Sequence, residues 1–145
     1  MASCRPLAVD PELSGLTALT RLLQIAGGQR APVNTLARYA EIVERIGEAG
    51  AEMALLGLLD ACMSFADALR ALPAPASSGL PADVVEGLRD WITLAQRYAS
   101  SPGDEVAGAA LVEHLRRPCW RVSISDAEAS SMREALGMMP QPEHC

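Results

Sequence analysis

The chain has 145 residues, which is enough for one domain with its own hydrophobic core. Half of the residues are hydrophobic but only 3% are aromatic, so the core is expected to consist mainly of Leu, Ala, Val, Ile and Met. The formal net charge of −6 disfavours binding to nucleic acid or to an anionic membrane surface. All twelve basic residues are Arg, which excludes mechanisms that need a catalytic or phosphate-binding Lys.

The sequence also indicates where in the cell the protein is expected. The first residues lack the apolar core of a signal peptide, and no uncharged apolar run approaches the roughly 18–20 residues of a membrane span. Four Cys residues are scattered along the chain without a disulfide-like pattern. We therefore expect a cytoplasmic protein with reduced thiols and no membrane partner. The exclusive use of Arg is typical of codon usage in a GC-rich bacterial genome.

Helix signals begin near the N-terminus. The Asp-Pro-Glu sequence at 10–12 predicts the start of a first helix, and the Gly pair at 27–28 predicts its end. A second helix is predicted after Pro32. A third helix, from about residue 51 to residue 72, is the most apolar segment of the chain. An almost entirely apolar helix is typical of the middle of a bundle.

The second half of the chain continues this pattern. Residues 73–81, PAPASSGLP, predict a loop before a fourth helix. The Ser-Pro-Gly-Asp sequence at 101–104 predicts the end of that helix and the N-cap of a fifth, which Pro118 stops. Residues 119–124, CWRVSI, are the only stretch with extended character. A capping box of Ser and Glu at 125–128 predicts a last short helix.

These elements predict an all-α protein. Short connections place consecutive helices next to each other in antiparallel orientation. We therefore expect a single domain over residues 1–145. Residues 10–117 would form an up-and-down antiparallel helical bundle of four main helices, and residues 118–145 a short C-terminal appendage.

Three glycines interrupt the region EIVERIGEAGAEMALLGLLD, although Gly in a helix interior costs about 0.5–1 kcal/mol relative to Ala. We expect Gly50 to end the second helix in a left-handed conformation, and Gly57 to be a packing seam within the third helix. Gly47 either allows close helix packing or keeps the face of Glu41 and Glu48 open to a partner. Of these two roles for Gly47, we rank close packing first.

The sequence assigns no catalytic residue, metal site or cofactor. Metal-binding pairs such as C-x-x-C or H-x-x-x-H are absent, and so is the nucleophile elbow G-x-S-x-G. Cys62 lies among apolar residues and is expected to be a buried, unreactive thiol. His114 is interpreted as a surface or half-buried residue at a helix end, where the helix dipole favours a cation. A phospho-accepting role, with Arg116 and Arg117 nearby, is the alternative for His114. We therefore do not expect an enzyme.

Carboxylates form one ordered pattern. Glu41, Glu44 and Glu48 recur at three- and four-residue spacing and share one side of the second helix with Arg45. A charged outer helix face is the ordinary interpretation of this pattern. The functional interpretation is an acidic recognition strip for a basic or Arg-lined protein partner.

The segment from about residue 37 to residue 117 resembles a histidine-phosphotransfer (Hpt) domain of chemotaxis-type signalling proteins. The likeness lies in the small-residue turn IGEAGAE, the apolar helix LLGLLDACMSFADALRAL and the later helix PADVVEGLRDWITLAQRY. In that family the first helix carries an exposed phospho-accepting His, followed by a Lys. Here the corresponding position falls near Ala40 or Glu41. No His is present at this position, and no Lys follows it. The resemblance therefore implies a module that does not carry phosphate.

Two functional hypotheses follow. The first is a non-catalytic signalling module that binds a receiver domain or histidine kinase through Glu41, Arg45, Gly47 and Glu48. The second is a helical adaptor or chaperone-type protein, for example one associated with a secretion system. It would dock a client or form a homo-oligomer through an apolar surface that includes an exposed Trp120.

Overall fold

The computed structural model of the chain describes residues 6–25, 32–72 and 80–138. These residues form six α-helices and one 3₁₀ turn, and they contain no β-strand, which confirms the all-α prediction for this part of the chain. The elements are α1 (Asp10–Ile25), α2 (Pro32–Glu52), α3 (Leu56–Ala71), α4 (Ala82–Ser100), α5 (Glu105–Leu115), the 3₁₀ turn η1 (Pro118–Trp120) and α6 (Asp126–Leu136). The predicted stop at 27–28, most of the loop at 73–81 and the part of the predicted C-terminal appendage after residue 138 lie outside the described residues.

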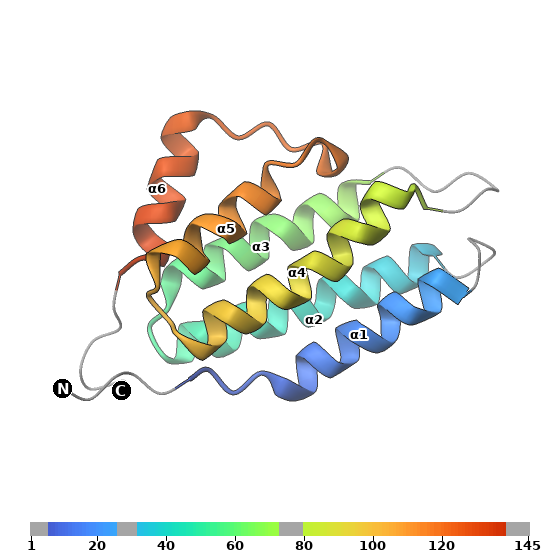
Figure 1. Cartoon of the computed structure of the whole chain (residues 1–145), viewed down its shortest axis with the longest axis horizontal. Coiled ribbons are helices and arrows are strands. Elements are labelled where there is room, and N and C mark those ends of the chain that lie inside the picture. Colours follow the sequence, from blue (N-terminus) through green and yellow to red (C-terminus); the bar gives the residue numbers. More distant parts are fainter. Residues whose placement is uncertain (1–5, 26–31, 73–79, 139–145) are drawn as a thin grey trace.

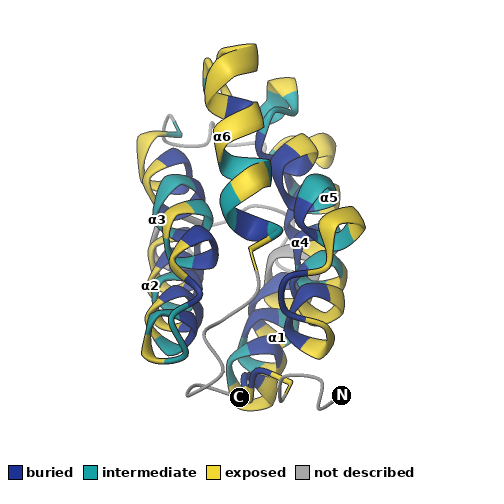
Figure 2. Cartoon of the chain, turned by 90° about the vertical axis from the view of Figure 1, so that its left-hand side faces the viewer, coloured by how far each residue is buried: buried dark blue, intermediate teal, exposed yellow. Residues whose placement is uncertain are grey.

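The helices are arranged in two layers (Figure 2). One layer contains α2 and α3, which pack extensively against each other, and the other contains α1, α4 and α5. Consecutive helices from α1 to α5 run in opposite directions, as Figure 1 shows. The α1 helix packs against both α2 and α4 and so joins the layers along one side. At one end of the molecule, α6 packs against α3 and α5 and closes the space between the layers.

Two predicted helix starts are confirmed by their hydrogen bonds. The Asp104 carboxylate accepts from the backbone N–H groups of Val106 and Ala107, at 2.8 and 3.1 Å, and so caps α5. The Ser125 hydroxyl oxygen accepts from the backbone N–H of Glu128 at 3.1 Å and caps α6. Both caps satisfy donors that an isolated helix start would leave without partners.

The turn between α2 and α3 corrects the prediction for Gly50. Gly50 is helical, because α2 continues to Glu52, and its carbonyl accepts from the N–H groups of Met53 and Leu55. The left-handed residue of this turn is Ala54, with φ 63°. The prediction assigned that conformation to Gly because a side chain makes it costly. The structure uses Gly50 for close packing instead: a Cβ there would lie 2.9 Å from Leu58 Cδ2.

The segment after α5 also differs from its prediction. Residues 118–120, which begin just before the predicted extended stretch, form the 3₁₀ turn, and residues 121–125 have no regular secondary structure. Pro118 fits the start of such a turn because its ring fixes φ near −65°. Arg121 ends the turn in the left-handed conformation, with φ 58°. The turn directs Trp120 into the protein interior, where its side chain is buried.

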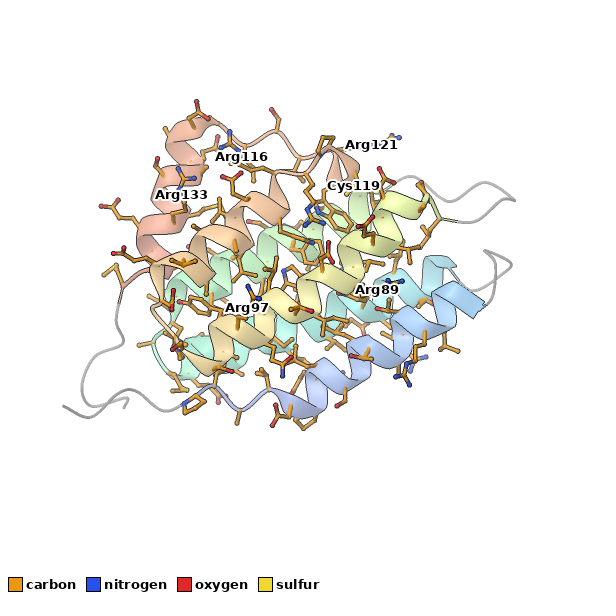
Figure 3. The ribbon with its side chains drawn as sticks, viewed as in Figure 1. Arg89, Arg97, Arg116, Cys119, Arg121 and Arg133 are labelled. Atoms are coloured by element: carbon orange, nitrogen blue, oxygen red, sulfur yellow. The ribbon has the colours of Figure 1, made fainter. Side chains whose placement is uncertain are left out.

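Ion pairs join α6 to α5 at the surface. Arg116 Nη2 lies 2.7 Å from an Asp126 carboxylate oxygen, and Arg133 Nη1 lies 3.1 Å from Glu113 Oε1. Arg116 and Arg133 are labelled in Figure 3. Each pair is partly exposed and contributes at most about 1 kcal/mol. The stronger attachment of α6 is its buried packing.

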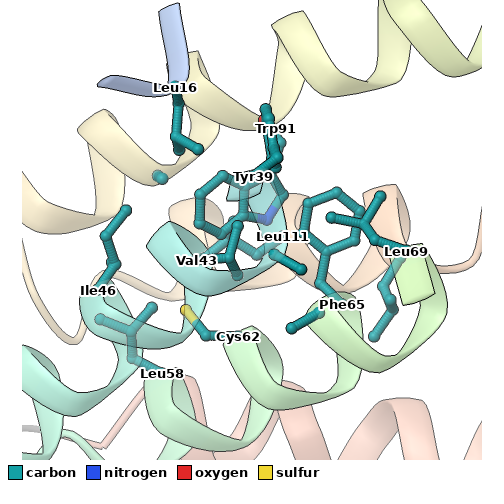
Figure 4. Close-up of a cluster of buried hydrophobic side chains, with 14 of the residues drawn as sticks. Leu16, Tyr39, Val43, Ile46, Leu58, Cys62, Phe65, Leu69, Trp91 and Leu111 are labelled. Atoms are coloured by element: carbon teal, nitrogen blue, oxygen red, sulfur yellow. The ribbon is translucent and has the colours of Figure 1, made fainter. Parts of the chain in front are cut away.

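The hydrophobic core lies between the layers and receives side chains from every helix (Figure 4). Its members include Leu16, Val43, Ile46, Leu58, Phe65, Leu69, Trp91 and Leu111. Two buried Tyr hydroxyls donate across helices. Tyr39 of α2 bonds to the Leu88 carbonyl of α4, and Tyr98 of α4 bonds to the Leu136 carbonyl of α6, both at 2.6 Å. Since buried hydroxyls need hydrogen-bond partners, these bonds fix the relative positions of the helices.

Two glycines admit the C-terminal end of α6. A Cβ on Gly57 of α3 would lie 2.6 Å from the Ala135 carbonyl carbon, and a Cβ on Gly108 of α5 would lie 2.8 Å from Leu136 Cβ. The predicted role of Gly57 as a packing seam is therefore confirmed. The partner across that seam is α6, and the contact is with its backbone.

We predict that Gly57→Ala destabilises the protein by about 1–3 kcal/mol, because the new methyl group would meet backbone atoms that cannot rotate away. Gly15→Ala in α1 is the matched control, since its Cβ would meet only the flexible end of Ile42, at 3.3 Å. Urea denaturation followed by circular dichroism measures both variants. Gly15→Ala is expected to leave stability unchanged or to raise it by up to about 1 kcal/mol. Equal midpoints for Gly57→Ala and the parent chain would contradict the close approach of α6.

Candidate functional site

The charged face predicted on the second helix is present on α2. Glu41, Arg45 and Glu48 are all exposed, and their spacing of four and three residues places them along one side of the helix. None of the three forms an ion pair with another described residue. We call these residues the α2 strip. Because no described residue forms an ion pair with them, these charges are available to a partner.

Glu44 differs from its neighbours on α2. It forms an ion pair and a hydrogen bond with Arg70 of α3, across the pair of helices. The hydrogen bond from Arg70 lowers the pKa of Glu44, and the same bond raises the pKa of Arg70. Glu44 therefore has a structural partner within the layer, while the α2 strip beside it has none.

Gly47 does not belong to the exposed strip. It is buried at the contact between α2 and α3, where a Cβ would lie 2.8 Å from the Cβ of Cys62. Of the two roles predicted for Gly47, the structure shows close packing. Cys62 on the facing helix is fully buried, and burial raises the pKa of its thiol. A thiol held protonated in this way is a poor nucleophile, as the sequence led us to expect.

Trp120 lies in the core and does not form the exposed contact that the adaptor hypothesis expected. Only 1% of its surface is exposed, and its ring centroid lies 4.9 Å from that of Phe65 on α3. The indole occupies the space above Gly87 of α4, where a Cβ would lie 2.5 Å from Trp120 Cζ2. The sequence could not show this placement, because it depends on a glycine more than thirty positions earlier in the chain.

His114 is buried beside Trp120, which corrects the prediction of a helix-end cation. Its side chain is 2% exposed, and Nε2 lies 2.7 Å from the Gly87 carbonyl. A carbonyl only accepts hydrogen bonds, so Nε2 carries the proton and donates. Nδ1 has no hydrogen-bond partner among the described residues. His114 projects into the core from the same side of α5 as Leu111 and Leu115.

Burial controls the protonation of His114. It lowers the pKa to about 4, although the hydrogen bond to Gly87 acts in the opposite direction. Of the two nearby charged side chains, Arg117 lowers this pKa and Asp90 raises it. The imidazole is therefore neutral near pH 7. The inaccessible ring does not suit the alternative role of a phospho-acceptor, because that reaction needs an exposed nitrogen.

We predict that acid weakens the protein through His114. Between pH 6.5 and pH 4 the unfolded chain binds a proton that the folded chain excludes, so this contribution is complete above pH 6.5 and is lost as pH falls. The loss amounts to about 3 kcal/mol at pH 4. Urea denaturation at several pH values should show a flatter pH dependence for His114→Phe than for the parent chain. His144→Gln, at the other histidine, is the control. A parallel pH dependence in His114→Phe would contradict the neutral buried ring.

We predict that Trp120 reports a core environment. Trp91→Phe leaves Trp120 as the sole tryptophan, since the chain has two. Its fluorescence should be blue-shifted relative to the urea-unfolded chain and only weakly quenched by acrylamide, because the ring is buried. Emission and quenching equal to those of the unfolded chain would place Trp120 at the surface and restore it as a contact for a client.

The comparisons with known proteins return no relative: no family model, curated protein or solved structure matches the chain. Within the described ranges, no helix has the length and apolar character needed to cross a membrane. No three His, Cys, Asp or Glu side chains in those ranges lie close enough together to hold a metal ion. A function for the chain has therefore to be derived from the placement of its own side chains.

Proposed function

We propose that the chain is a non-catalytic signalling module, a pseudo-Hpt-like bundle that binds a receiver domain or histidine kinase without carrying phosphate. The observation that carries this proposal is the α2 strip, in which Glu41, Arg45 and Glu48 are exposed, adjacent and without ion-pair partners among the described residues. Charges at the edge of an interface mainly determine which partner binds and how fast it associates. In the up-and-down bundle of this proposal, residues 10–117 supply the four main helices, and residues 118–145 form the C-terminal appendage.

The residues at the expected phosphorylation position support this proposal. The resemblance places the phospho-accepting His near Ala40 or Glu41; Ala40 is buried, whereas Glu41 is exposed. Glu41 therefore offers a carboxylate where the family has its phosphorylated imidazole. This carboxylate needs no phosphoryl donor. A partner that recognises negative charge on this helix face could bind without any phosphoryl transfer.

The histidines give the second support. His114 is the histidine that the described residues contain, and it is buried with Nε2 bonded to the Gly87 carbonyl. Phosphorylation of its ring would require α4 and α5 to separate. The absence of Lys removes the residue that follows the His in the resembling family. Both features favour docking over phosphoryl transfer.

The alternative function is a helical adaptor or chaperone-type protein, for example in a secretion system. Burial of Trp120 removes the aromatic anchor that this alternative expected. One observation still favours it, because large apolar side chains of α3 and α5 are exposed at one end of the molecule. A client that binds there would be insensitive to charge reversal in the α2 strip, so one set of variants separates the two functions.

We predict that reversing charge in the α2 strip abolishes partner binding. Immobilised receiver domains and histidine kinases serve as probes, and the dissociation constant is measured by biolayer interferometry. Glu41→Arg is expected to weaken binding at least about tenfold, equivalent to about 1.4 kcal/mol, and the double variant Glu41→Arg/Glu48→Arg to abolish it. Glu86→Arg on α4 is the matched control, since Glu86 is equally exposed and lies in the other layer.

Helicity by circular dichroism should be unchanged in all of these variants. Binding that survives the double variant would show that the α2 strip is not the docking face. Incubation with a phosphodonor kinase supplies a second check. Acid-labile label on His114 would show that the module carries phosphate, which contradicts the proposal.

A further inference from the structure

Exposed apolar side chains gather at the end of the molecule where α6 finishes. Leu56 in the first turn of α3, Val106 in the first turn of α5 and Met138 just after α6 are three of the four exposed large hydrophobic residues in the described ranges. The fourth, Leu22, is on α1. We call the first three residues the apolar end. Single exposed apolar residues are common, but a group around one helix terminus marks an interaction surface.

The packing of α6 shows why these residues lie near one another. Gly57, next to Leu56, contacts the backbone of Ala135 and Leu136, and Gly137 lies against the side chain of Glu105, next to Val106. The end of α6 therefore lies between the starts of α3 and α5 (Figure 1). Met138 continues the chain from this point. The three exposed side chains therefore lie around the end of α6.

The α5 helix extends this region because its outer side is apolar between Glu105 and Glu113. Gly108, Leu111, Val112 and Leu115 face the core, as expected for a packed helix. On the outer side, Val106 is 81% exposed and is followed by the half-buried Ala109 and Ala110. A helix at the edge of a soluble protein normally presents polar residues to water. Between the exposed Glu105 and Glu113, the outer side of α5 carries Val106, Ala109 and Ala110 and no polar residue.

Two grooves border Val106 and share it as a common wall. One lies between α5 and α6, with Ala109 and Gly137 in its lining, and the other lies between α4 and α5, with Leu94 and Ala110 in its lining. The small side chains of α5 leave both grooves open between its neighbours. The exposed side chain of Val106 therefore projects between two hollows of the surface.

The charges at the grooves identify the partner. The α5–α6 groove contains Arg133 with Glu105 and Glu134, and the α4–α5 groove contains Arg97 with Asp104. Arg97 and Arg133 are labelled in Figure 3. Each groove thus has both signs of charge. A strongly basic or strongly acidic partner would meet like charge in each groove, which costs binding energy.

A second copy of the chain avoids this conflict. A two-fold axis perpendicular to α5 turns each groove onto the same groove of the other copy, with its direction reversed. In the α4–α5 groove, Arg97 of one copy can then approach Asp104 of the other, whereas Arg133 of the α5–α6 groove already pairs with Glu113 of its own chain. Arg97 forms no ion pair with another described residue, so it is free to contribute.

We propose that two copies of the chain associate through the apolar end and the outer side of α5, with the two Val106 side chains near the two-fold axis and each groove facing the same groove of the other copy. The interface is isologous, like that of most homodimers. It does not involve the α2 strip, which is in the other layer. The proposal is independent of the signalling function.

Sedimentation velocity over a range of protein concentrations tests this proposal. The parent chain is expected to sediment as a dimer, and Val106→Glu is expected to weaken the dimer at least about tenfold, because the carboxylate would be buried in an apolar contact. Leu22→Glu is the matched control, with the same substitution at an exposed apolar residue of α1. It is expected to leave the dimer intact. Arg97→Glu should weaken the dimer as well, since it removes the positive charge from the α4–α5 groove.

The exposure of Val106 allows an effect of Val106→Glu on association to be distinguished from an effect on folding. Because that side chain is 81% exposed, Val106→Glu should leave helicity by circular dichroism unchanged. A parent chain that is monomeric at every concentration would overturn the proposal and leave the surface to a different protein. A dimer that withstands Val106→Glu, or one that Leu22→Glu disrupts equally, would also overturn it. The α2 strip variant Glu41→Arg/Glu48→Arg is expected to remain dimeric, so failure of the signalling function is a distinguishable result.

Discussion

The contact between Trp120 and Gly87 determines how the second half of the chain is assembled. Because Gly87 has no Cβ, the indole lies directly on the α4 backbone and also reaches Phe65 of α3. The Gly87 carbonyl accepts the hydrogen bond from His114, so α5 is fixed at the same point. Phe65 contacts rings from α2, α4, α5 and the 3₁₀ turn. In a chain with only 3% aromatic residues, this one cluster joins both layers.

The sequence predicts those parts of the fold that depend on local interactions. The caps of α5 and α6 are examples, because Asp104 and Ser125 bond to N–H groups only two or three residues away. Predictions from the sequence are wrong for features that depend on residues far away in the chain. Gly50 was expected in the left-handed position that Ala54 occupies, because the need for a small residue opposite Leu58 is invisible in the sequence. Burial of His114 depends in the same way on Gly87.

The candidate site likewise has features that local sequence predicts and features that depend on distant residues. Exposure of Glu41, Arg45 and Glu48 follows from helical periodicity, so the α2 strip could be predicted from spacing alone. The ion pair of Glu44 could not, because Arg70 is 26 positions away on another helix. The apolar end was missed because Leu56, Val106 and Met138 are far apart in the chain and meet only where α6 is inserted. One sequence signal was available. The helix EVAGAALVEHL has no polar residue between Glu105 and Glu113, and this apolar run is longer than a surface helix needs.

The position of the two surfaces in different layers has a consequence for signalling. A dimer formed through α5 leaves α2 of each copy uncovered, because α2 and α3 form the layer away from α4 and α5. Each dimer then presents two α2 strips at a fixed separation. A partner that is itself dimeric could engage both strips, and the second contact would form at the high effective concentration that the first creates. Weak charged contacts at each strip would then give a strong combined interaction without phosphate. Dimerisation would thus supply affinity that three exposed charges lack individually.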